Sequence, residues 1–442
     1  MAHHNEESFD RRMTVVRELI RGLGLKDTEV TPVRWTGDRP YPYNNFIYKV
    51  QLSTPALAEH FSGAAQPQRQ PCTALPPTGG VSTLIVRLSN PKAGGMNNAN
   101  RVENEVAAMH LARGAVAELA PAYAGVVPAI YAWKAAAGPN PVDETGFGWI
   151  MMEYLTGSPL AAEFKSFDMT GKKSVLHGMA AIFSAIQGVK LPPGVNRFGG
   201  LTINEKGDIV SGQEALQPVP GGPWPEYADV WKHQLRCELK QADNSAVVSG
   251  WQANGIRERI DQFSSSGALS NVIRDGGVDM TKLALVHQDF TMGNMLYDPD
   301  NKRISGIVDF DWAAATHPAN EFFFTSLHDI HGSTREQESK KLQQAILTGD
   351  FGASADPGEE KHAEAWELAK TWSQAVKECG GHRASDIAGM ATLEKLNNFI
   401  DLICPWQLGS GGTSAQRSAE QNAKERADLE KAIDEMLCGW GV

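Results

Sequence analysis

Hydrophobic positions in the first third of the chain occur in short runs, separated by polar stretches that contain glycine and proline. Runs of this length with branched and aromatic side chains are typical of β-strands. Ahead of them, Phe9, Met13, Val16 and Ile20 recur at helical spacing, which predicts a leading helix over residues 6–22. Strands are predicted at residues 31–36, 46–52, 83–88, 126–133 and 148–154.

The hydrophobic spacing becomes mainly helical after residue 153. We therefore predict two domains, a β-rich one over residues 1–153 and a helical one over residues 154–442. Residues 53–80 show no periodicity, and we predict a flexible insertion between strands there. Helical segments are predicted within 161–190, 222–262, 318–405 and 415–437, and an irregular hairpin within 197–212.

Composition narrows the class of protein. Hydrophobic residues make up 42% of the chain and charged residues 21%, which is typical of a globular protein with a large core. The five cysteines never form a C-x-x-C pair, and no secretory signal or membrane-spanning run is visible. We therefore expect a cytoplasmic protein. A net charge of −11 argues against nucleic acid or an anionic membrane as a partner. The oligomeric state is not predicted.

The strongest chemical pattern lies between residues 285 and 311. His287, Asp289 and Asn294 have the spacing H-x-D-x-x-x-x-N, and Asp309 follows an apolar strand. A carboxylate in such a loop can accept the proton of a hydroxyl group. An amide oxygen and a second carboxylate are ligands that Mg²⁺ takes together with the phosphates of ATP. We predict Asp289 as the catalytic residue and Asn294 and Asp309 as metal ligands.

Two neighbours of these residues have open roles. We expect His287 to brace the loop by hydrogen bonds rather than to transfer protons. Asp311 could contact a second metal ion, or it could be a solvated acid at the end of the strand.

A cation in an apolar strand needs a partner. Arg87 lies in the predicted strand 83–88, and Glu105 lies in a helix marked by Val102, Val106, Met109 and Leu111. An ion pair between these two residues would orient the α- and β-phosphates of ATP. The alternative is an arginine at a strand edge and a glutamate that faces water.

Two further segments are candidates for nucleotide contacts. The loop 37–45, between two predicted strands, is placed to cover phosphates and contains the candidate Asn45; it could equally be an ordinary hairpin connection. The strand 148–154 then runs into a glycine- and proline-containing segment, as a linker between lobes would. There we expect the backbone carbonyl of Glu153 and the backbone N–H of Leu155 to bind adenine, with Met152 beside the base.

Together these motifs resemble the aminoglycoside phosphotransferase and choline kinase group, within the broad phosphotransferase enzyme family. The resemblance rests on the segments 286–296 and 307–312, and it is supported by the linker 152–157 together with Arg87 and Glu105. It covers most of residues 30–330. It implies an α+β, protein-kinase-like bilobal fold with a nucleotide-binding N-terminal lobe. It also implies ATP- and Mg²⁺-dependent phosphorylation of a hydroxyl group on a small molecule.

Two departures from the family pattern leave an alternative open. The phosphate loop lacks the glycines of a protein-kinase loop, and the cation on the third strand is Arg87 rather than lysine, which is not an equivalent donor. The alternative is a catalytically weak or inactive nucleotide-binding protein with a regulatory or binding role. A protein kinase is disfavoured, because no A-P-E segment follows Asp309.

The acceptor is not specified by any motif. An acidic C-terminal lobe would suit a cationic amino-alcohol or an aminoglycoside-like metabolite. The candidate acids are Glu321, Asp329, Glu364 and Glu367, each of which could instead be solvated. Trp366, Trp372 and Trp406 could form a cation–π wall or belong to the core.

Overall fold

The computed structural model describes residues 5–33, 42–62, 69–216, 220–323, 326–334, 339–352, 360–409 and 417–442. Its N-terminal lobe is built on a five-stranded antiparallel sheet in the order β1-β2-β3-β5-β4. The strands are β1 (Asp27–Val33), β2 (Asn45–Ala56), β3 (Val81–Ser89), β4 (Ile130–Lys134) and β5 (Trp149–Glu153). The leading helix α1 (Phe9–Gly22) buries Val16 and Ile20 in the same core as Val50, Leu84 and Val86 of the sheet.

The described part of residues 53–80 is more regular than the flexible insertion that we expected. Strand β2 continues to Ala56, and the short helix α2 (Ala58–Phe61) follows it. Farther along, Gln70 donates a hydrogen bond to the carbonyl of Trp133 at 2.7 Å, and the N–H of Ala74 donates to the carbonyl of Ile130 at 2.7 Å. These contacts cover the edge of β4. Hydrophobic periodicity could not predict these contacts, because each is made by a single side chain or backbone group and leaves no repeating pattern in the sequence.

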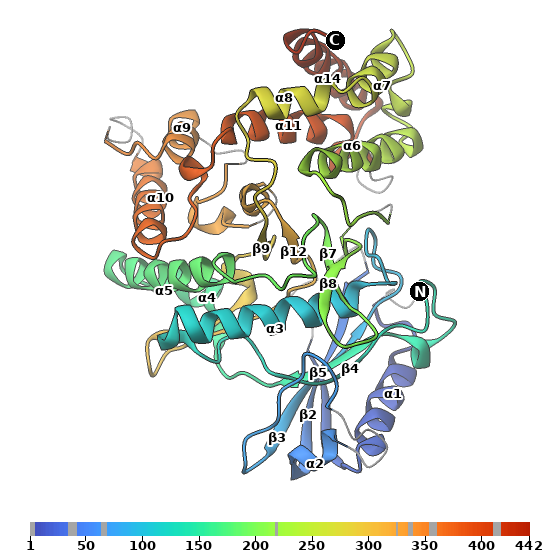
Figure 1. Cartoon of the computed structure of the whole chain (residues 1–442), viewed down its shortest axis with the longest axis vertical. Coiled ribbons are helices and arrows are strands. Elements are labelled where there is room, and N and C mark those ends of the chain that lie inside the picture. Colours follow the sequence, from blue (N-terminus) through green and yellow to red (C-terminus); the bar gives the residue numbers. More distant parts are fainter. Residues whose placement is uncertain are drawn as a thin grey trace.

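Helix α3 (Arg101–Leu119) crosses the molecule between the sheet and the helical lobe (Figure 1). Val102, Val106, Met109 and Ala112 are all at most 2% exposed, and they belong to the core of the helical lobe rather than to the core of the sheet. The helix therefore connects to the N-terminal lobe in sequence but packs mainly on the C-terminal lobe.

The C-terminal lobe is mainly helical, as predicted (Figure 1). Its helices are α4 (Leu160–Glu163), α5 (Met169–Gln187), α6 (Tyr227–Asn244), α7 (Ile256–Ser265), α8 (Ala268–Asp275), α9 (Lys340–Thr348), α10 (Glu360–Glu378), α11 (Met390–Ile403), α12 (Trp406–Gly409) and α14 (Ala419–Gly439). Its short strands are β6 (Ser158–Pro159), β7 (Gly200–Ile203), β8 (Ile209–Gly212), β9 (Ala284–Val286), β10 (Met295–Asp298), β11 (Arg303–Ile307) and β12 (Ala314–Thr316). The pair β7–β8 is the predicted hairpin.

The α+β, two-lobed architecture predicted from the sequence is confirmed. We propose that the lobes meet after Glu153, because β5 ends there in the large sheet and β6 already pairs with β10 of the helical lobe. In the described ranges, no helix is long and apolar enough to cross a bilayer.

Candidate active site

The loop that carries Asp289 begins where β9 ends at Val286, and it closes in a single 3₁₀ turn over Met292–Asn294. The side-chain amide of Asn294 donates to the backbone oxygen of Asp289 at 2.9 Å and to its carboxylate at 2.8 Å. Gln288, immediately before Asp289, has a left-handed φ of 62°. Non-glycine residues in this region are uncommon and are concentrated at functional sites.

His287 is fully buried next to this loop. Its Nδ1 accepts a hydrogen bond from the N–H of Asp289 at 3.3 Å, and its ring packs against Phe310. Burial lowers the pKa of His287 to about 4, so the ring is neutral near pH 7. A neutral, buried ring that accepts from the loop backbone fits the bracing role that we expected.

Glu321 holds the start of the loop. Its carboxylate, 1% exposed, accepts hydrogen bonds from the N–H of His287 at 2.8 Å and from the N–H of Gln288 at 2.9 Å. The hydroxyl of Ser326 donates to Glu321 at 2.7 Å and accepts from the N–H of Phe290 at 2.9 Å. Burial raises the pKa of Glu321 to about 7. Glu321 is therefore neither a solvated acid nor an acceptor ligand, the two readings that the sequence allowed.

Asp329 holds the far end of the same loop. Its carboxylate accepts a hydrogen bond from the N–H of Met292 at 2.6 Å, and burial raises its pKa to about 6. Like Glu321, Asp329 was a candidate acid for a cationic acceptor and instead binds the loop backbone. Sequence alone could not separate these roles, because an acid that braces a loop and an acid that binds a ligand have the same residue type.

Asp309 is brought next to Asn294 by strand pairing. Strands β10 and β11 are antiparallel, with Met295 opposite Ile307, and the N–H of Val308 donates to the carbonyl of Asn294 at 2.9 Å. Asp309 follows with a left-handed φ of 67°, and its side chain is 30% exposed. Burial, together with the nearby carboxylate of Asp311, raises the pKa of Asp309 to about 6.

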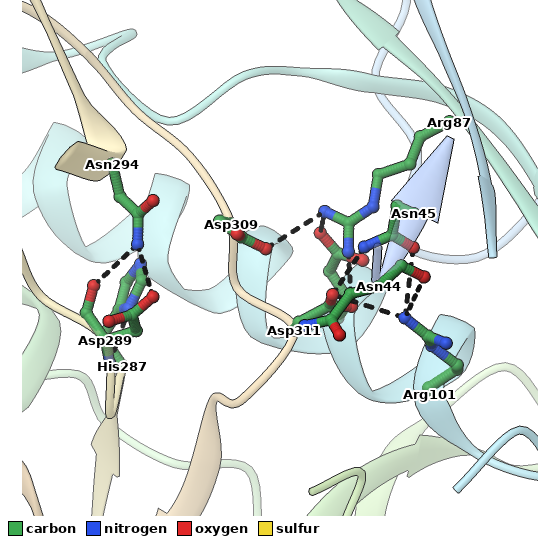
Figure 2. Close-up of polar contacts among 10 residues, drawn as sticks. Asn44, Asn45, Arg87, Arg101, His287, Asp289, Asn294, Asp309 and Asp311 are labelled. Carbon is green, nitrogen blue, oxygen red and sulfur yellow. Dashed lines mark hydrogen bonds and ion pairs between the residues drawn. The ribbon is translucent and has the colours of Figure 1, made fainter. Parts of the chain in front are cut away.

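The donor set at Asn294 and Asp309 fits a magnesium ion. The side-chain N–H₂ group of Asn294 donates hydrogen bonds to Asp289 (Figure 2). The amide oxygen is therefore the atom that can bind a metal ion as a neutral ligand. Asp309 Oδ1 is buried without a hydrogen-bond partner in the described structure. Mg²⁺ is typically bound by one or two protein carboxylates plus phosphate and water oxygens. In the described residues, no group of three or more His, Cys, Asp or Glu side chains is arranged to hold a metal ion.

Arg87 forms the predicted ion pair with Glu105. Both side chains are buried, and the guanidinium also contacts two further carboxylates, a close ion pair with Asp311 and a 3.7 Å contact with Asp309. The structure thus joins Arg87 from β3 and Glu105 from α3 to the segment that follows β11. The reading in which Arg87 lies at a strand edge and Glu105 faces water is wrong.

Asp311 lies at the centre of this buried cluster (Figure 2). Its Oδ2 accepts from the amide of Asn45 at 2.5 Å and lies 3.4 Å from a guanidinium nitrogen of Arg101. Asp311 is 2% exposed, so it is not the solvated acid that the sequence allowed. The hydrogen bond from Asn45 shows that its side chain points toward Asp311.

The loop 37–45 that we expected to cover phosphates lies largely outside the described residues.

Arg101 is a site residue that the sequence analysis missed. It is 1% exposed, and it donates to the carbonyls of Asn44 at 2.9 Å and Asn90 at 3.2 Å. The available signal was its spacing. Arg101 and Glu105 are four residues apart, so they share one face of helix α3. An arginine on the same helical face as a predicted buried glutamate could have been recognised.

The candidate adenine contacts lie where β5 leaves the sheet. Met152 is 6% exposed and pairs with Ile85 and Ile130 across the sheet. The Glu153 carboxylate accepts from the N–H of Ala129 at 3.0 Å and lies 3.3 Å from Arg113. The side chain of Glu153 is thus used to fix the strand. The adenine role of the Glu153 carbonyl and the Leu155 N–H stays a prediction.

The other residues that were candidates for binding the acceptor lie in the core or form ion pairs. Trp366 and Trp372 are 8% and 4% exposed, and Trp372 packs on Phe183 and Phe290 in the core. Glu364 pairs with Lys172, and Glu367 lies 2.5 Å from Lys173 on the surface. The Trp406 side chain lies outside the described residues.

The profile of the phosphotransferase enzyme family matches residues 77–364, more than half of the chain. The chain belongs to the phosphotransferase enzyme family. The family match confirms the resemblance seen in the sequence, and with it the protein-kinase-like fold that the resemblance implied. Arg87, Glu105, Asp289, Asn294 and Asp309 all lie within the matched residues, whereas Asn45 precedes them.

Solved structures with similar folds include three named proteins. The ADP-bound aminoglycoside phosphotransferase APH(2'')-Ib has 13% identity and a TM-score of 0.44, with 96% of this chain and 98% of that chain covered. The streptomycin–ATP complex of APH(2'')-IIa has 12% identity and a TM-score of 0.49, with 96% and 97% covered. The ethanolamine kinase of Plasmodium vivax has 12% identity and a TM-score of 0.39, with 93% and 82% covered.

Because each TM-score is below 0.5, no conclusion about the ligands of this chain follows from these likenesses. Among curated proteins, no sequence matches the chain.

Proposed function

We propose that this member of the phosphotransferase family is an ATP- and Mg²⁺-dependent kinase that phosphorylates a hydroxyl group of a small molecule. The observation that carries the proposal is the convergence of three parts. The helical lobe contributes Asp309 and the loop that holds Asp289 and Asn294. The other part is the ion pair of Arg87 with Glu105, and Arg87 lies 3.7 Å from Asp309 (Figure 2). Phosphoryl transfer depends mainly on such positioning and on electrostatic stabilisation.

In the proposed reaction, the acceptor hydroxyl lies against the carboxylate of Asp289. The acceptor oxygen forms a bond to the γ-phosphorus, and the bond from that phosphorus to the oxygen bridging the β- and γ-phosphates breaks. The hydroxyl proton passes to Asp289, and ADP leaves. The Asn294 amide donates a hydrogen bond of 2.8 Å to the Asp289 carboxylate, which holds the carboxylate in place for this proton transfer.

Asn294 Oδ1 and the carboxylate of Asp309 are the residues that would hold magnesium. A bound Mg²⁺ ion neutralises the negative charge that develops on the phosphate oxygens. Arg87 supplies positive charge at the same place, and Glu105 forms a buried ion pair with its guanidinium. We assign the backbone at Glu153 and Leu155, with Met152, to the adenine ring.

We propose a cationic acceptor such as an amino-alcohol or an aminoglycoside-like metabolite, because the net charge of the chain is −11. The cavity beside Gln288, which Glu214, Gln234 and Trp312 also line, has a volume of about 20 Å³ and holds about one water molecule, so it is not the acceptor site.

The alternative, a weak or inactive nucleotide-binding protein, is favoured by one observation. Three carboxylates already surround Arg87, which leaves it less positive charge for phosphates than a lysine paired with one glutamate would have.

The test is phosphate transfer from Mg·ATP to a panel of amino-alcohols, aminoglycosides and neutral sugars. We expect transfer to at least one acceptor, lost in Asp289→Ala and unchanged in Asp300→Asn, which alters an exposed turn between β10 and β11. Tight Mg·ATP binding with no transfer to any acceptor would establish the alternative. A chain that does not bind Mg·ATP would contradict both functions.

A further inference from the structure

Both carboxylate oxygens of Asp311 lie against cations. Its Oδ1 accepts no hydrogen bond but forms a close ion pair with Arg87, and its Oδ2 is shared between Asn45 at 2.5 Å and Arg101 at 3.4 Å. Asp311 is 2% exposed, whereas the Asp309 side chain, two residues earlier, is 30% exposed. These two acids therefore have different surroundings, because Asp309 lies between Asn294 and Arg87, whereas Asp311 lies among Arg87, Asn45 and Arg101 (Figure 2).

Helix α3 holds this segment directly at two points and indirectly at a third. Arg101 contacts Asp311, the Asn104 amide donates to the carbonyl of Ala313 at 2.8 Å, and Glu105 pairs with Arg87, which in turn pairs with Asp311. Arg101 is three residues from Asn104 and four from Glu105, so the three lie on one helical face. The segment 309–313 is therefore attached to one face of α3 at the start of the helix.

The orientation of Arg87 depends on Asp311. One guanidinium nitrogen of Arg87 contacts Glu105 and lies 3.7 Å from Asp309, while the other pairs with Asp311. If Asp311 were neutral, the second nitrogen would lose its ion pair. The guanidinium would then be held through one nitrogen alone, and its fork would no longer have a fixed direction, because arginine is oriented best when both nitrogens bind carboxylates.

We propose that Asp311 and Arg101 form a positioning pair that orients Arg87, and that Asp311 is not itself a metal ligand. The inference rests on the proposed function. It differs from it in assigning a role to two residues that do not face the nucleotide. Arg101, at 1% exposure, cannot reach a ligand, and it contacts Arg87 through Asp311 while it also donates to the carbonyls of Asn44 and Asn90.

The experiment compares Asp311→Asn, Arg101→Met, Asp309→Asn and the control Asp300→Asn in the full chain. The readouts are turnover of Mg·ATP, the Mg²⁺ concentration at half-maximal turnover, and affinity for Mn²⁺ with ATP by electron paramagnetic resonance. Turnover is measured with the acceptor found in the panel or, failing that, with water. For Asp311→Asn and Arg101→Met we expect kcat to fall roughly 10²-fold, the scale of loss for misplaced catalytic groups.

The metal readouts separate positioning from ligation. We expect the half-maximal Mg²⁺ concentration and the Mn²⁺ affinity to change by less than about threefold in Asp311→Asn, and by more than about tenfold in Asp309→Asn. A loss of Mn²⁺ affinity in Asp311→Asn equal to that in Asp309→Asn would overturn the inference. Asp311→Asn that folds and turns over like Asp300→Asn would overturn it as well.

A single variant leaves a buried charge without its partner and can unfold the chain. The double variant Asp311→Asn with Arg101→Met removes both charges together. Because the two residues act as one unit, we expect its kcat to be no lower than that of the worse single variant. Losses that multiply would contradict a shared role. If the wild-type chain shows no turnover, the proposed function fails, and the Mn²⁺ affinities still decide whether Asp311 is a ligand.

Discussion

Glu321 shows how one buried side chain can control a reactive loop without touching a substrate. Its carboxylate accepts hydrogen bonds from two successive backbone N–H groups just before Asp289 and from the Ser326 hydroxyl. These donors offset part of the cost of burying the carboxylate. Burial remains the larger effect, because the pKa of Glu321 is raised to about 7.

This raised pKa predicts how stability depends on pH. The folded chain holds the Glu321 proton up to about pH 7, whereas an unfolded chain releases it near 4.5, the ordinary value. The stabilisation from Glu321 is therefore fully present below pH 4.5 and is lost as the pH rises through about 7. Between these pH values, the free energy of unfolding of the wild type should fall by about 3 kcal/mol relative to that of Glu321→Gln. Urea unfolding at a series of pH values measures this difference. Glu364→Gln, at an exposed position, should run parallel to the wild type; a parallel Glu321→Gln curve would refute the prediction.

The sequence predicted some site residues better than others, for a physical reason. Asp289, Asn294 and Asp309 lie within 21 positions of one another, so their spacing alone brought out the pattern. Glu105 could be paired with Arg87 because a buried charge requires a partner. Arg101 was missed, and the contact of Asn45 with Asp311 was not predicted, because Asp311 is 210 and 266 residues away from them. Nothing local in the sequence encodes such a contact.

At the scale of elements, α3 and the hairpin β7–β8 pack too closely for a side chain at Gly200. A Cβ there would overlap the carbonyl oxygen of Gln213 and lie 2.9 Å from Asn104 Oδ1. Asn104 accepts a hydrogen bond from the N–H of Leu201 at 2.7 Å, so the hairpin is fixed directly to the helix. The short strand β7 thus has a part in holding α3 in place.

We expect Gly200→Ala to lower the free energy of unfolding by about 1–3 kcal/mol, because a backbone carbonyl cannot move aside cheaply. The matched control is Gly114→Ala, on the exposed face of α3, where a Cβ meets nothing within 4 Å. This control should raise stability by about 0.5–1 kcal/mol, since alanine favours the helix. Both values come from urea unfolding of the full chain. Equal effects of the two substitutions would contradict the close packing at Gly200.

The elements themselves were predictable to different degrees. Strands β3 and β5 were predicted to within two residues because buried strands form continuous apolar runs. The sequence also predicted helix α3, but it did not predict that this helix packs mainly on the C-terminal lobe. Its buried residues are apolar whichever core they enter, so composition does not reveal the partner. Ala115 and Val116 illustrate this, since either lobe could have buried them.

At the scale of the whole molecule, a nucleotide bound as we propose would contact both lobes. Arg87 comes from the sheet, whereas Asn294 and Asp309 come from the helical lobe. A ligand that binds only the folded chain stabilises it by mass action. Mg²⁺ with a non-hydrolysable ATP analogue, at 100 times its dissociation constant, should therefore add about 2.7 kcal/mol to the free energy of unfolding.

The measurement is denaturant unfolding with and without the analogue, with EDTA as the metal-free condition. Removal of Mg²⁺ should abolish most of the gain, and Asp309→Asn should show little gain at the same concentrations. A gain of the same size in EDTA would mean that the nucleotide binds without the proposed metal site.

The cluster around Asp311 has a consequence in time as well as in space. A ribosome makes Arg87 and Arg101 long before it makes Asp311, which follows Arg101 by 210 residues. Protein synthesis proceeds at about 5–20 residues per second, so Asp311 is added roughly 10–40 s after the two arginines. Until then, the segment that will become the N-terminal lobe carries two cations destined for burial with part of their negative charge missing. The lobe made first can therefore complete its buried charge cluster only after most of the other lobe has been made.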